Sequence, residues 1–144
     1  MARSAAVKGG DRGFRMIRSF AAGAGNMPVK RTSDITKERV EAATGTYRQV
    51  LIGPEEGPNF AMRRFIIEPG GAMPKHVNRV EHEQFVLQGK AQVGIGEDVC
   101  EVKKDDVVFI PAGVVHWYKT VGDEAFAFLC VVPNRPDEVT LVES

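Results

Sequence analysis

A series of short, valine-rich segments separated by turn signals is the feature that most constrains the fold of this chain. Valine, which occurs 19 times against four leucines, is branched at Cβ and packs well on the pleated surface of a sheet. Glycine, proline and aspartate separate the segments about every ten residues, which is typical of sandwiches and barrels. The sequence therefore predicts an all-β fold. The eight expected strands are Tyr47–Ile52, Phe60–Glu68, Glu83–Gln88, Lys90–Ile95, Val99–Val102, Asp106–Ile110, His116–Val121 and Phe126–Val132.

The N-terminal part of the chain differs in composition from the rest. Residues 1–26 carry five basic side chains and one acidic one, and they show no sustained apolar periodicity. Such a segment cannot bury enough apolar surface to order itself. We therefore expect a flexible basic tail at 1–26 and a single domain over 27–144. An organelle transit peptide, or a translation start placed too far upstream, would share the features of the tail. Residues 36–43 permit either a short helix or an extended arm.

Charge and cysteine content exclude several classes of protein. Nineteen basic side chains balance nineteen acidic ones, so the chain lacks the basic face with which proteins bind nucleic acids or acidic membranes. No apolar run approaches the roughly 20 residues that cross a bilayer. Cys100 and Cys130 lack the spacing of a zinc or redox site, and we expect both to be buried thiols. These observations predict a soluble, cytoplasmic protein that binds neither nucleic acid nor membranes.

Three histidines offer the chemistry to which the sequence points. His76 and Asn78 share one face of an extended segment because side chains alternate along a strand, and His82 follows with the same parity. His116 opens another expected strand, which an antiparallel sheet can bring alongside the first. Imidazoles that converge inside a small barrel can bind a divalent transition metal. Isolated histidines are more often structural, so their spacing alone leaves both interpretations open.

The surroundings of these histidines resemble the two sequence motifs of the cupin superfamily. The first motif reads Gly70, five residues, His76-Val77-Asn78, three residues, His82, six residues and Gly89. The second reads Asp105, five residues, Pro111-Ala112-Gly113, two residues, His116, three residues and Thr120. Both spacings match those of the superfamily. The resemblance spans residues 50–133 and implies a cupin-type double-stranded β-helix, which is a jelly-roll barrel.

The resemblance also implies a ligand set. It is greatest to small single-domain cupins with a manganese-type site of four histidines, in which HxHxxxH replaces HxHxxxE. Asn78 stands where that pattern has its second histidine, and Asp105 and Thr120 replace a glycine and an asparagine. An amide oxygen is a weaker ligand than imidazole for most of these metals, so Asn78 would bind weakly or hydrogen-bond to metal-bound water. The implied site is His76, Asn78, His82 and His116 around one divalent manganese, iron, nickel, cobalt or zinc ion.

Side chains next to the histidines have weaker claims to a role. Glu81 and Glu83 flank His82 and should point to the opposite side of the strand, although one of them could accept an imidazole N–H. Tyr118 shares the face of His116 and either reaches into the pocket or packs in the core.

Two kinds of function fit these features. The first is a metal-dependent enzyme, similar to a decarboxylase or dioxygenase, that acts on a small organic acid or related metabolite. The second is a non-catalytic module that binds a small ligand or a metal as a sensor or storage protein. Of Arg63 and Arg64, one could face the barrel and bind a substrate carboxylate, whereas two solvated side chains are the commoner outcome.

The parity of one expected strand predicts a homodimer. If Gln84 and Val86 face the barrel, Phe85 and Leu87 face outward and need cover. Residues 30–49 are also long enough to add a strand to the sheet of a neighbouring copy. The resemblance implies the same state, because cupins of this size are commonly dimers.

Overall fold

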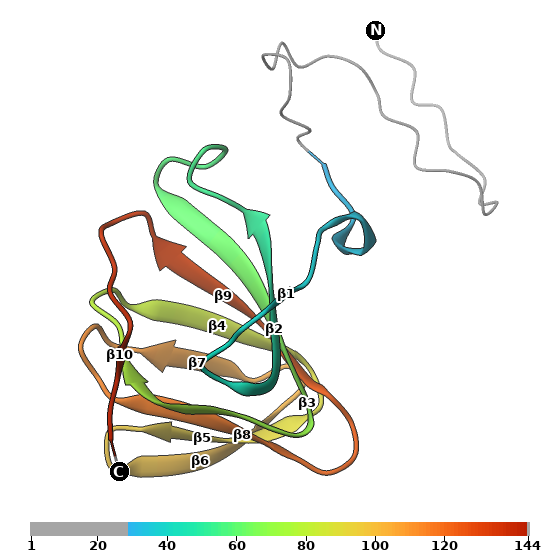
Figure 1. The fold of residues 1–144 in the computed structure, drawn as a ribbon, viewed down its shortest axis with the longest axis vertical. Helices are drawn as coiled ribbons and strands as arrows, with labels where there is room; N and C mark the ends of the chain where they lie inside the picture. Colours follow the sequence, from blue (N-terminus) through green and yellow to red (C-terminus); the bar gives the residue numbers. More distant parts are fainter. Residues whose placement is uncertain (1–28, 144) are drawn as a thin grey trace, which may run out of the picture.

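The valine-rich segments form one antiparallel sheet that curls into a jelly-roll barrel (Figure 1), which confirms the expected all-β fold. The computed structural model describes residues 29–143, so the tail expected at residues 1–26 lies outside it. The strands are β1 (Glu38–Arg39), β2 (Thr44–Ile52), β3 (Phe60–Val77), β4 (His82–Gln88), β5 (Lys90–Ile95), β6 (Asp98–Lys103), β7 (Val107–Ile110), β8 (His116–Val121), β9 (Phe126–Pro133) and β10 (Thr140–Leu141). All eight expected strands are present.

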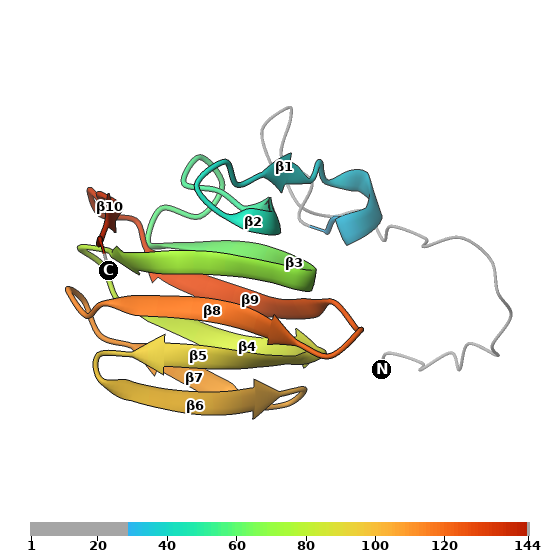
Figure 2. The same ribbon diagram turned by 60° about the horizontal axis from the view of Figure 1, so that its bottom comes forward.

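The long strand β3 joins the two layers of the barrel. Its first half pairs with β9 and its second half with β8, in the strand order β6-β5-β8-β3-β9-β4-β7. Figure 2 shows β8, β5 and β6 in one layer, with β9, β4 and β7 behind them. The strand expected at Phe60–Glu68 continues through Pro69–Gly71, so the expected end at Glu68 was wrong. The strand bends there but stays in the sheet, with Gly70 at φ 76°.

Two motif glycines should respond very differently to alanine substitution. A Cβ on Gly89 would lie 2.3 Å from the carbonyl oxygen of Ala125, and its φ is +73°. A Cβ on Gly70, at φ +76°, would meet no atom within 4 Å. We therefore expect Gly70→Ala to cost only the left-handed strain of about 1 kcal/mol, and Gly89→Ala to lower the free energy of unfolding by several times that amount. Urea unfolding measures both, and equal losses would contradict the close approach at Gly89.

Side-chain alternation in β4 and β8 agrees with the prediction. His82, Gln84 and Val86 are buried, whereas Glu83 and Phe85 are exposed on the opposite face. On β8, the side chains at 116, 118 and 120 are buried in the same way. Both strands therefore direct polar and aromatic side chains into the barrel, where the rest of the core is aliphatic or aromatic.

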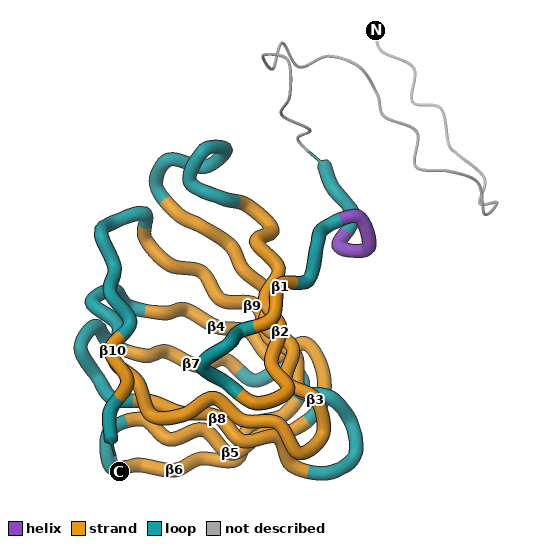
Figure 3. Tube along the Cα trace, viewed as in Figure 1, coloured by secondary structure: helices purple, strands orange, loops and turns teal. Residues whose placement is uncertain are grey.

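The N-terminal arm is extended and folds onto its own chain. A 3-10 turn, η1 (Thr32–Asp34), is the one helical element of the described residues (Figure 3), and the helix permitted at 36–43 does not form. β1 pairs with β2, and β2 pairs with β3. Gln49 holds η1 in place because its amide nitrogen, Nε2, donates to the carbonyls of Thr32 and Ile35 at 2.8 and 2.7 Å. The arm thus extends the sheet of its own chain.

The two cysteines differ in their environments. Cys130 is buried in β9, as expected, but Cys100 is exposed on β6, so the prediction of two buried thiols was half wrong. Cys100 shares a face with buried Val93 and Val102, but β6 lies at the end of the strand order, so no further strand lies beyond it. No helix within residues 29–143 has the length and hydrophobicity needed to cross a membrane.

Candidate metal centre

The structure brings the three histidines together at one end of the barrel. His76 lies near the end of β3 and is registered opposite His116, the first residue of β8. Their ring centroids are 4.1 Å apart, and the ring of His82, the first residue of β4, is centred 5.3 Å from that of His116. β3 and β8 are paired, and β4 lies in the opposite layer. The fold therefore brings together His76 and His116, which are 40 positions apart in the sequence.

All three imidazoles line one small inner cavity of about 30 Å³. This volume is sufficient for a single ion or water molecule. The side chains around it are Phe65, Met73, His76, His82, Gln84, His116, Tyr118 and Phe128. The cavity is therefore lined by apolar and aromatic groups except where the imidazoles and the Gln84–Tyr118 pair face it.

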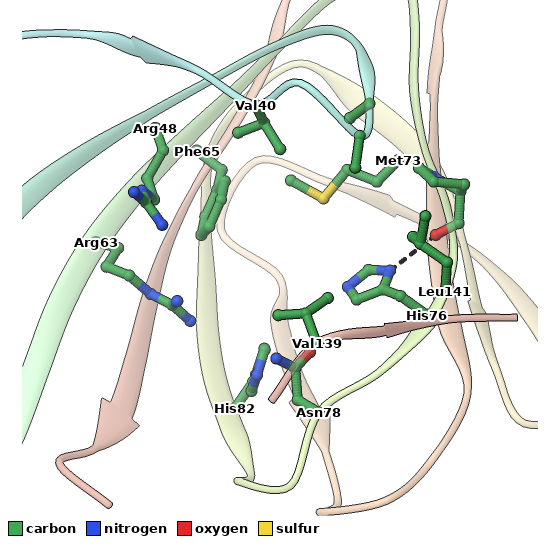
Figure 4. A pocket seen from close by; sticks show the side chains of 13 residues that line it. Val40, Arg48, Arg63, Phe65, Met73, His76, Asn78, His82, Val139 and Leu141 are labelled. Carbon is green, nitrogen blue, oxygen red and sulfur yellow. Dashed lines mark hydrogen bonds between the residues drawn. The ribbon is translucent and has the colours of Figure 1, made fainter. Parts of the chain in front are cut away.

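Backbone carbonyls fix the tautomer of two imidazoles. Nδ1 of His76 lies 2.7 Å from the carbonyl oxygen of Pro74, and Nδ1 of His116 lies 2.9 Å from that of Val114. A carbonyl can only accept, so each Nδ1 holds the proton and each Nε2 keeps its lone pair. Figure 4 shows the second ring nitrogen of His76 facing the pocket. Metal-binding histidines are commonly oriented in this way.

Three polar atoms of the predicted ligands are buried without a hydrogen-bond partner among residues 29–143. They are Nε2 of His82, Nε2 of His116 and Oδ1 of Asn78. Leaving such atoms unpaired in a protein interior costs free energy. Two imidazole nitrogens and an amide oxygen are a donor set that a divalent transition metal accepts. The unpaired atoms thus fit the group that the sequence motifs imply.

Asp137 determines which end of the Asn78 amide faces the site. Nδ2 of Asn78 donates to Oδ2 of Asp137 at 2.8 Å, and Oδ1 of Asp137 accepts from the backbone N–H groups of Arg79 and Glu138 at 2.8 and 2.9 Å. Because an ionised carboxylate only accepts, the amide nitrogen of Asn78 faces Asp137 and its oxygen is the unpaired atom. Sequence reasoning missed Asp137, which lies beyond both motifs and has no spacing that would single it out.

The donors surround a common cavity without forming a complete shell. Among residues 29–143, no three His, Cys, Asp or Glu side chains form a group that could hold a metal ion as they lie. Asn78 has an amide side chain and is not one of these four residue types. Of the predicted ligands, only the three histidines could therefore form such a group. The inner cavity, the fixed tautomers and the unpaired atoms are therefore the observations on which a metal proposal depends.

Burial keeps the histidines neutral. Desolvation lowers the pKa of His82 to about 3, with a further contribution from the positive charge of Arg63. Desolvation likewise lowers the pKa of His116 to about 4 and outweighs its hydrogen bond to the Val114 carbonyl. The pKa of His76 is also lowered by burial. Neutral imidazole is the form that binds metals, so no proton has to be displaced at neutral pH.

A larger pocket opens beside the histidines. It has a volume of about 140 Å³ and is shown in Figure 4. Its polar side chains are Arg48, Arg63, His76, Asn78 and His82, and its apolar walls come from the arm, β3 and the C-terminal segment. In this pocket the guanidinium groups of two arginines and the imidazoles of two histidines thus lie beside an apolar surface.

The remaining predictions about neighbouring side chains are now decided. Glu81 and Glu83 are exposed outside the barrel. Tyr118 is 2% exposed and packs in the core, where its hydroxyl is hydrogen-bonded to Gln84 at 2.7 and 3.0 Å. It also lines the inner cavity, so both interpretations of Tyr118 hold in part. Of Arg63 and Arg64, Arg63 is the one that lines the pocket.

Comparison with known proteins identifies the family. The family model described as "Cupin domain" matches residues 63–132. A cupin 2 domain-containing protein from Halorhodospira halophila is 30% identical, with 69% of this chain and 72% of that chain covered and a TM-score of 0.64. The chain belongs to the cupin superfamily. The expected cupin-type jelly roll is therefore confirmed.

Two relatives of this cupin are named as enzymes. The polyketide cyclase RemF from Streptomyces resistomycificus is 30% identical, with 83% of this chain and 87% of that chain covered and a TM-score of 0.74. The 1-methylthio-D-xylulose 5-phosphate methylsulfurylase of Rhodospirillum rubrum is 32% identical over 94 residues, which are 65% of this chain. The cupin spans 60% of the length of that methylsulfurylase. The names of these two relatives refer to different reactions, and a shared fold does not by itself determine a reaction.

Proposed function

We propose that this cupin binds one divalent transition metal through His76, Asn78, His82 and His116 and acts as an enzyme on a small organic acid. The observation that carries the proposal is the set of three buried, unpaired donor atoms on His82, His116 and Asn78. One divalent cation could satisfy all three at once, because an unprotonated Nε2 and an amide oxygen can each coordinate a metal ion. Manganese, iron, nickel, cobalt and zinc are the candidate ions.

Some residues would hold the metal ion, and others would keep its ligands oriented. The neutral imidazoles and the amide oxygen would hold the ion, while the carbonyls of Pro74 and Val114 and the carboxylate of Asp137 would keep these ligands oriented. Bound in this way, a metal supplies Lewis-acid chemistry and open positions for substrate oxygen atoms. The apolar side chains of Phe65 and Met73 would exclude water from the same space. Decarboxylation and dioxygenation are the proposed reaction classes.

Metal analysis followed by a substrate screen tests the proposal. The protein, purified without chelator, should contain close to one transition-metal ion per chain. Small mono- and dicarboxylic acids would then be tested for consumption with the identified metal, with and without oxygen. Oxygen uptake would indicate a dioxygenase, and carbon dioxide release without oxygen uptake would indicate a decarboxylase. A metal-loaded protein that consumes none of these acids would contradict the enzymatic part of the proposal.

One observation favours a non-catalytic binding module as the second candidate. The titratable side chains that line the larger pocket are two arginines and two histidines, so within the described residues no carboxylate lines it as a general base. The hydroxyl of Tyr118 is tied to Gln84, and both oxygens of Asp137 accept hydrogen bonds. A sensor or storage protein needs no such base. Saturable binding of a carboxylic acid without turnover would support this candidate.

Asn78→His should tighten metal binding by about tenfold or more, because imidazole is the better ligand for most of these ions. The introduced ring could still donate to Asp137. By contrast, Asp137→Ala should weaken binding by about 10- to 100-fold, as is typical when a group that orients a ligand is lost. Competition titrations with a chromophoric chelator measure both affinities. Unchanged affinity in both variants would place Asn78 outside the coordination shell.

The control for Asp137 is a double-mutant cycle. Asp137 also accepts the backbone N–H groups of Arg79 and Glu138, so its loss could loosen the C-terminal segment without acting on Asn78. In an Asn78→Ala background, Asp137→Ala should have little further effect on metal affinity if it acts through the amide. Additive losses would show a merely structural role for Asp137.

A further inference from the structure

Arg63 places an unpaired positive charge in the wall of the pocket. Its Nη2 lies 3.4 Å from the sulfur of Cys130, and its guanidinium lies 5.3 Å from the centroid of the Phe65 ring. Within the described residues it forms no ion pair, and its Nε is buried without a hydrogen-bond partner. A thiol and an aromatic ring are weak partners for a guanidinium, which has five N–H donors. Most of its hydrogen-bonding capacity is therefore free.

The neighbouring charges do not neutralise Arg63. Arg48 lines the same side of the pocket, and its own guanidinium is paired with Glu38 at 2.8 Å. Figure 4 shows Arg48 and Arg63 together on one side, with His76 across the pocket. The wall thus carries excess positive charge, since no acidic side chain of residues 29–143 lines the pocket. A partly buried guanidinium in such a place is stabilised by an anion from outside the chain.

The space between Arg63 and His76 is apolar. Phe65 and Met73 of β3, Val40 of the arm and Leu141 of β10 line it, and Figure 4 shows their side chains around the opening. A ligand that reaches from the guanidinium to the imidazoles must therefore pass apolar surface. A fully hydrophilic anion would leave these side chains in contact with water, whereas a carbon body would cover them.

We infer that Arg63 is the anion-binding residue of this pocket and that the substrate is a small carboxylate with an apolar carbon body. The carboxylate would lie on the fork of the guanidinium in a bidentate pair, and the carbon body would contact Phe65 and Met73. This inference rests on the proposed function, since it takes the histidine cluster as the reacting end of the same pocket. It adds which chemical class the pocket selects and which residue selects it.

Binding of three matched probes to the full-length protein tests the inference. Benzoate, benzamide and phenylphosphonate share an apolar ring and differ in the group presented to Arg63. By isothermal titration, benzoate should bind and benzamide should bind at least about tenfold more weakly. Equal binding of benzoate and benzamide would overturn the inference. Binding of phenylphosphonate without binding of benzoate would overturn the carboxylate assignment.

The adjacent arginine supplies the matched control. Arg63→Met should weaken benzoate binding by about 10- to 100-fold, the loss expected for charge-assisted hydrogen bonds. Arg64→Met, one position along the same strand and absent from the pocket lining, should leave it unchanged. Arg63→Lys keeps the charge without the fork and should lie between them. If Arg63→Met does not fold, Arg63→Lys is used in its place. Retained benzoate binding in the Arg63 variants would overturn the inference.

Metal content separates this inference from the proposed function. Each Arg63 variant should keep the metal stoichiometry of the wild type, because none of the candidate ligands is changed. Lost benzoate binding with unchanged metal content would support Arg63 as the selecting residue. Absence of metal from the wild-type protein would instead contradict the proposed function, and the comparison of Arg63 with Arg64 would still decide the anion site.

Discussion

Replacement of any one of His76, His82 and His116 by alanine is expected to reduce bound metal from near one ion per chain to a small fraction. Each variant removes an imidazole donor from a set that already contains one weak oxygen ligand, Asn78. The loss in affinity should exceed the roughly 10- to 100-fold that accompanies loss of a group that only orients a ligand. Metal analysis after equilibrium dialysis against each candidate ion measures the effect.

The fold should survive these substitutions. Nε2 of both His82 and His116 is buried without a partner, so removing either ring also removes an unpaired polar atom. Glu83→Gln is the matched control, because Glu83 is adjacent to His82 but lies exposed outside the barrel. It should retain full metal content. A wild-type protein that contains no metal and takes up no manganese, iron, nickel, cobalt or zinc would refute the metal site altogether.

The strands and the direction of their side chains could be predicted because both depend on local patterns. Strand side chains alternate with a period of two, so a single buried position, such as Val86, fixes the direction of His82 and Gln84 in the same strand. Apart from the end of β3, the turn signals placed the ends of the expected strands to within a few residues. The convergence of His76 and His116 followed from motif spacing, since antiparallel pairing aligns the start of β8 with the end of β3.

The features that were missed depend on long-range contacts. The strand expected to end at Glu68 instead bends at Pro69–Gly71 and continues, because β8 pairs with β3 beyond the bend. Asp137 reaches Asn78 across 59 positions of sequence, and no spacing rule connects them. Cys100 is exposed because β6 ends the strand order. Which strand lies at an edge is a property of topology, which hydrophobic patterns do not encode.

An apolar face on the outside of the barrel leads us to propose a homodimer. Phe85, Val107 and Phe109 are 41%, 75% and 52% exposed. They form two cross-strand rows, because Phe85 is registered opposite Val107 and Leu129, while Glu83 lies between Phe109 and Val131. This apolar face covers β9, β4 and β7. The described part of the arm leaves these three side chains exposed, because β2 pairs with the edge of β3 opposite to the one that pairs with β9.

Charge favours a second copy of this chain as the partner. Glu83 stands in one row of the apolar face, and Arg64 lies beside Leu129 at the end of the other. A twofold axis through the apolar face could pair Glu83 of one protomer with Arg64 of its partner, twice. Twofold pairing is also the commonest closed symmetry. One self-complementary face then supplies both apolar cover and charge balance.

Phe85→Glu should therefore convert a dimer into a monomer. Light scattering of the wild type at micromolar concentration should give about twice the chain mass of 15.8 kDa. Burying a phenylalanine side chain stabilises an interface by about 1.5 to 3 kcal/mol. A glutamate in its place loses this stabilisation and adds the cost of desolvating a carboxylate and its repulsion from Glu83. The dissociation constant of the dimer should therefore rise by at least about 100-fold. Val99→Glu is the control, since Val99 is 58% exposed on β6, outside the apolar face. Its dimer should persist.

The dimer should also depend on salt if the two charges meet. Exposed ion pairs at an interface are screened as ionic strength rises, so the dissociation constant should rise with salt. Arg64→Glu should weaken the dimer because it places two acidic side chains opposite each other. Glu83→Arg combined with Arg64→Glu should restore part of the loss. Failure of the exchanged pair to recover dimerisation would leave the apolar rows as the sole attraction. A wild-type protein that stays monomeric at all concentrations would refute the proposal, because nothing within residues 29–143 covers Val107 and Phe109.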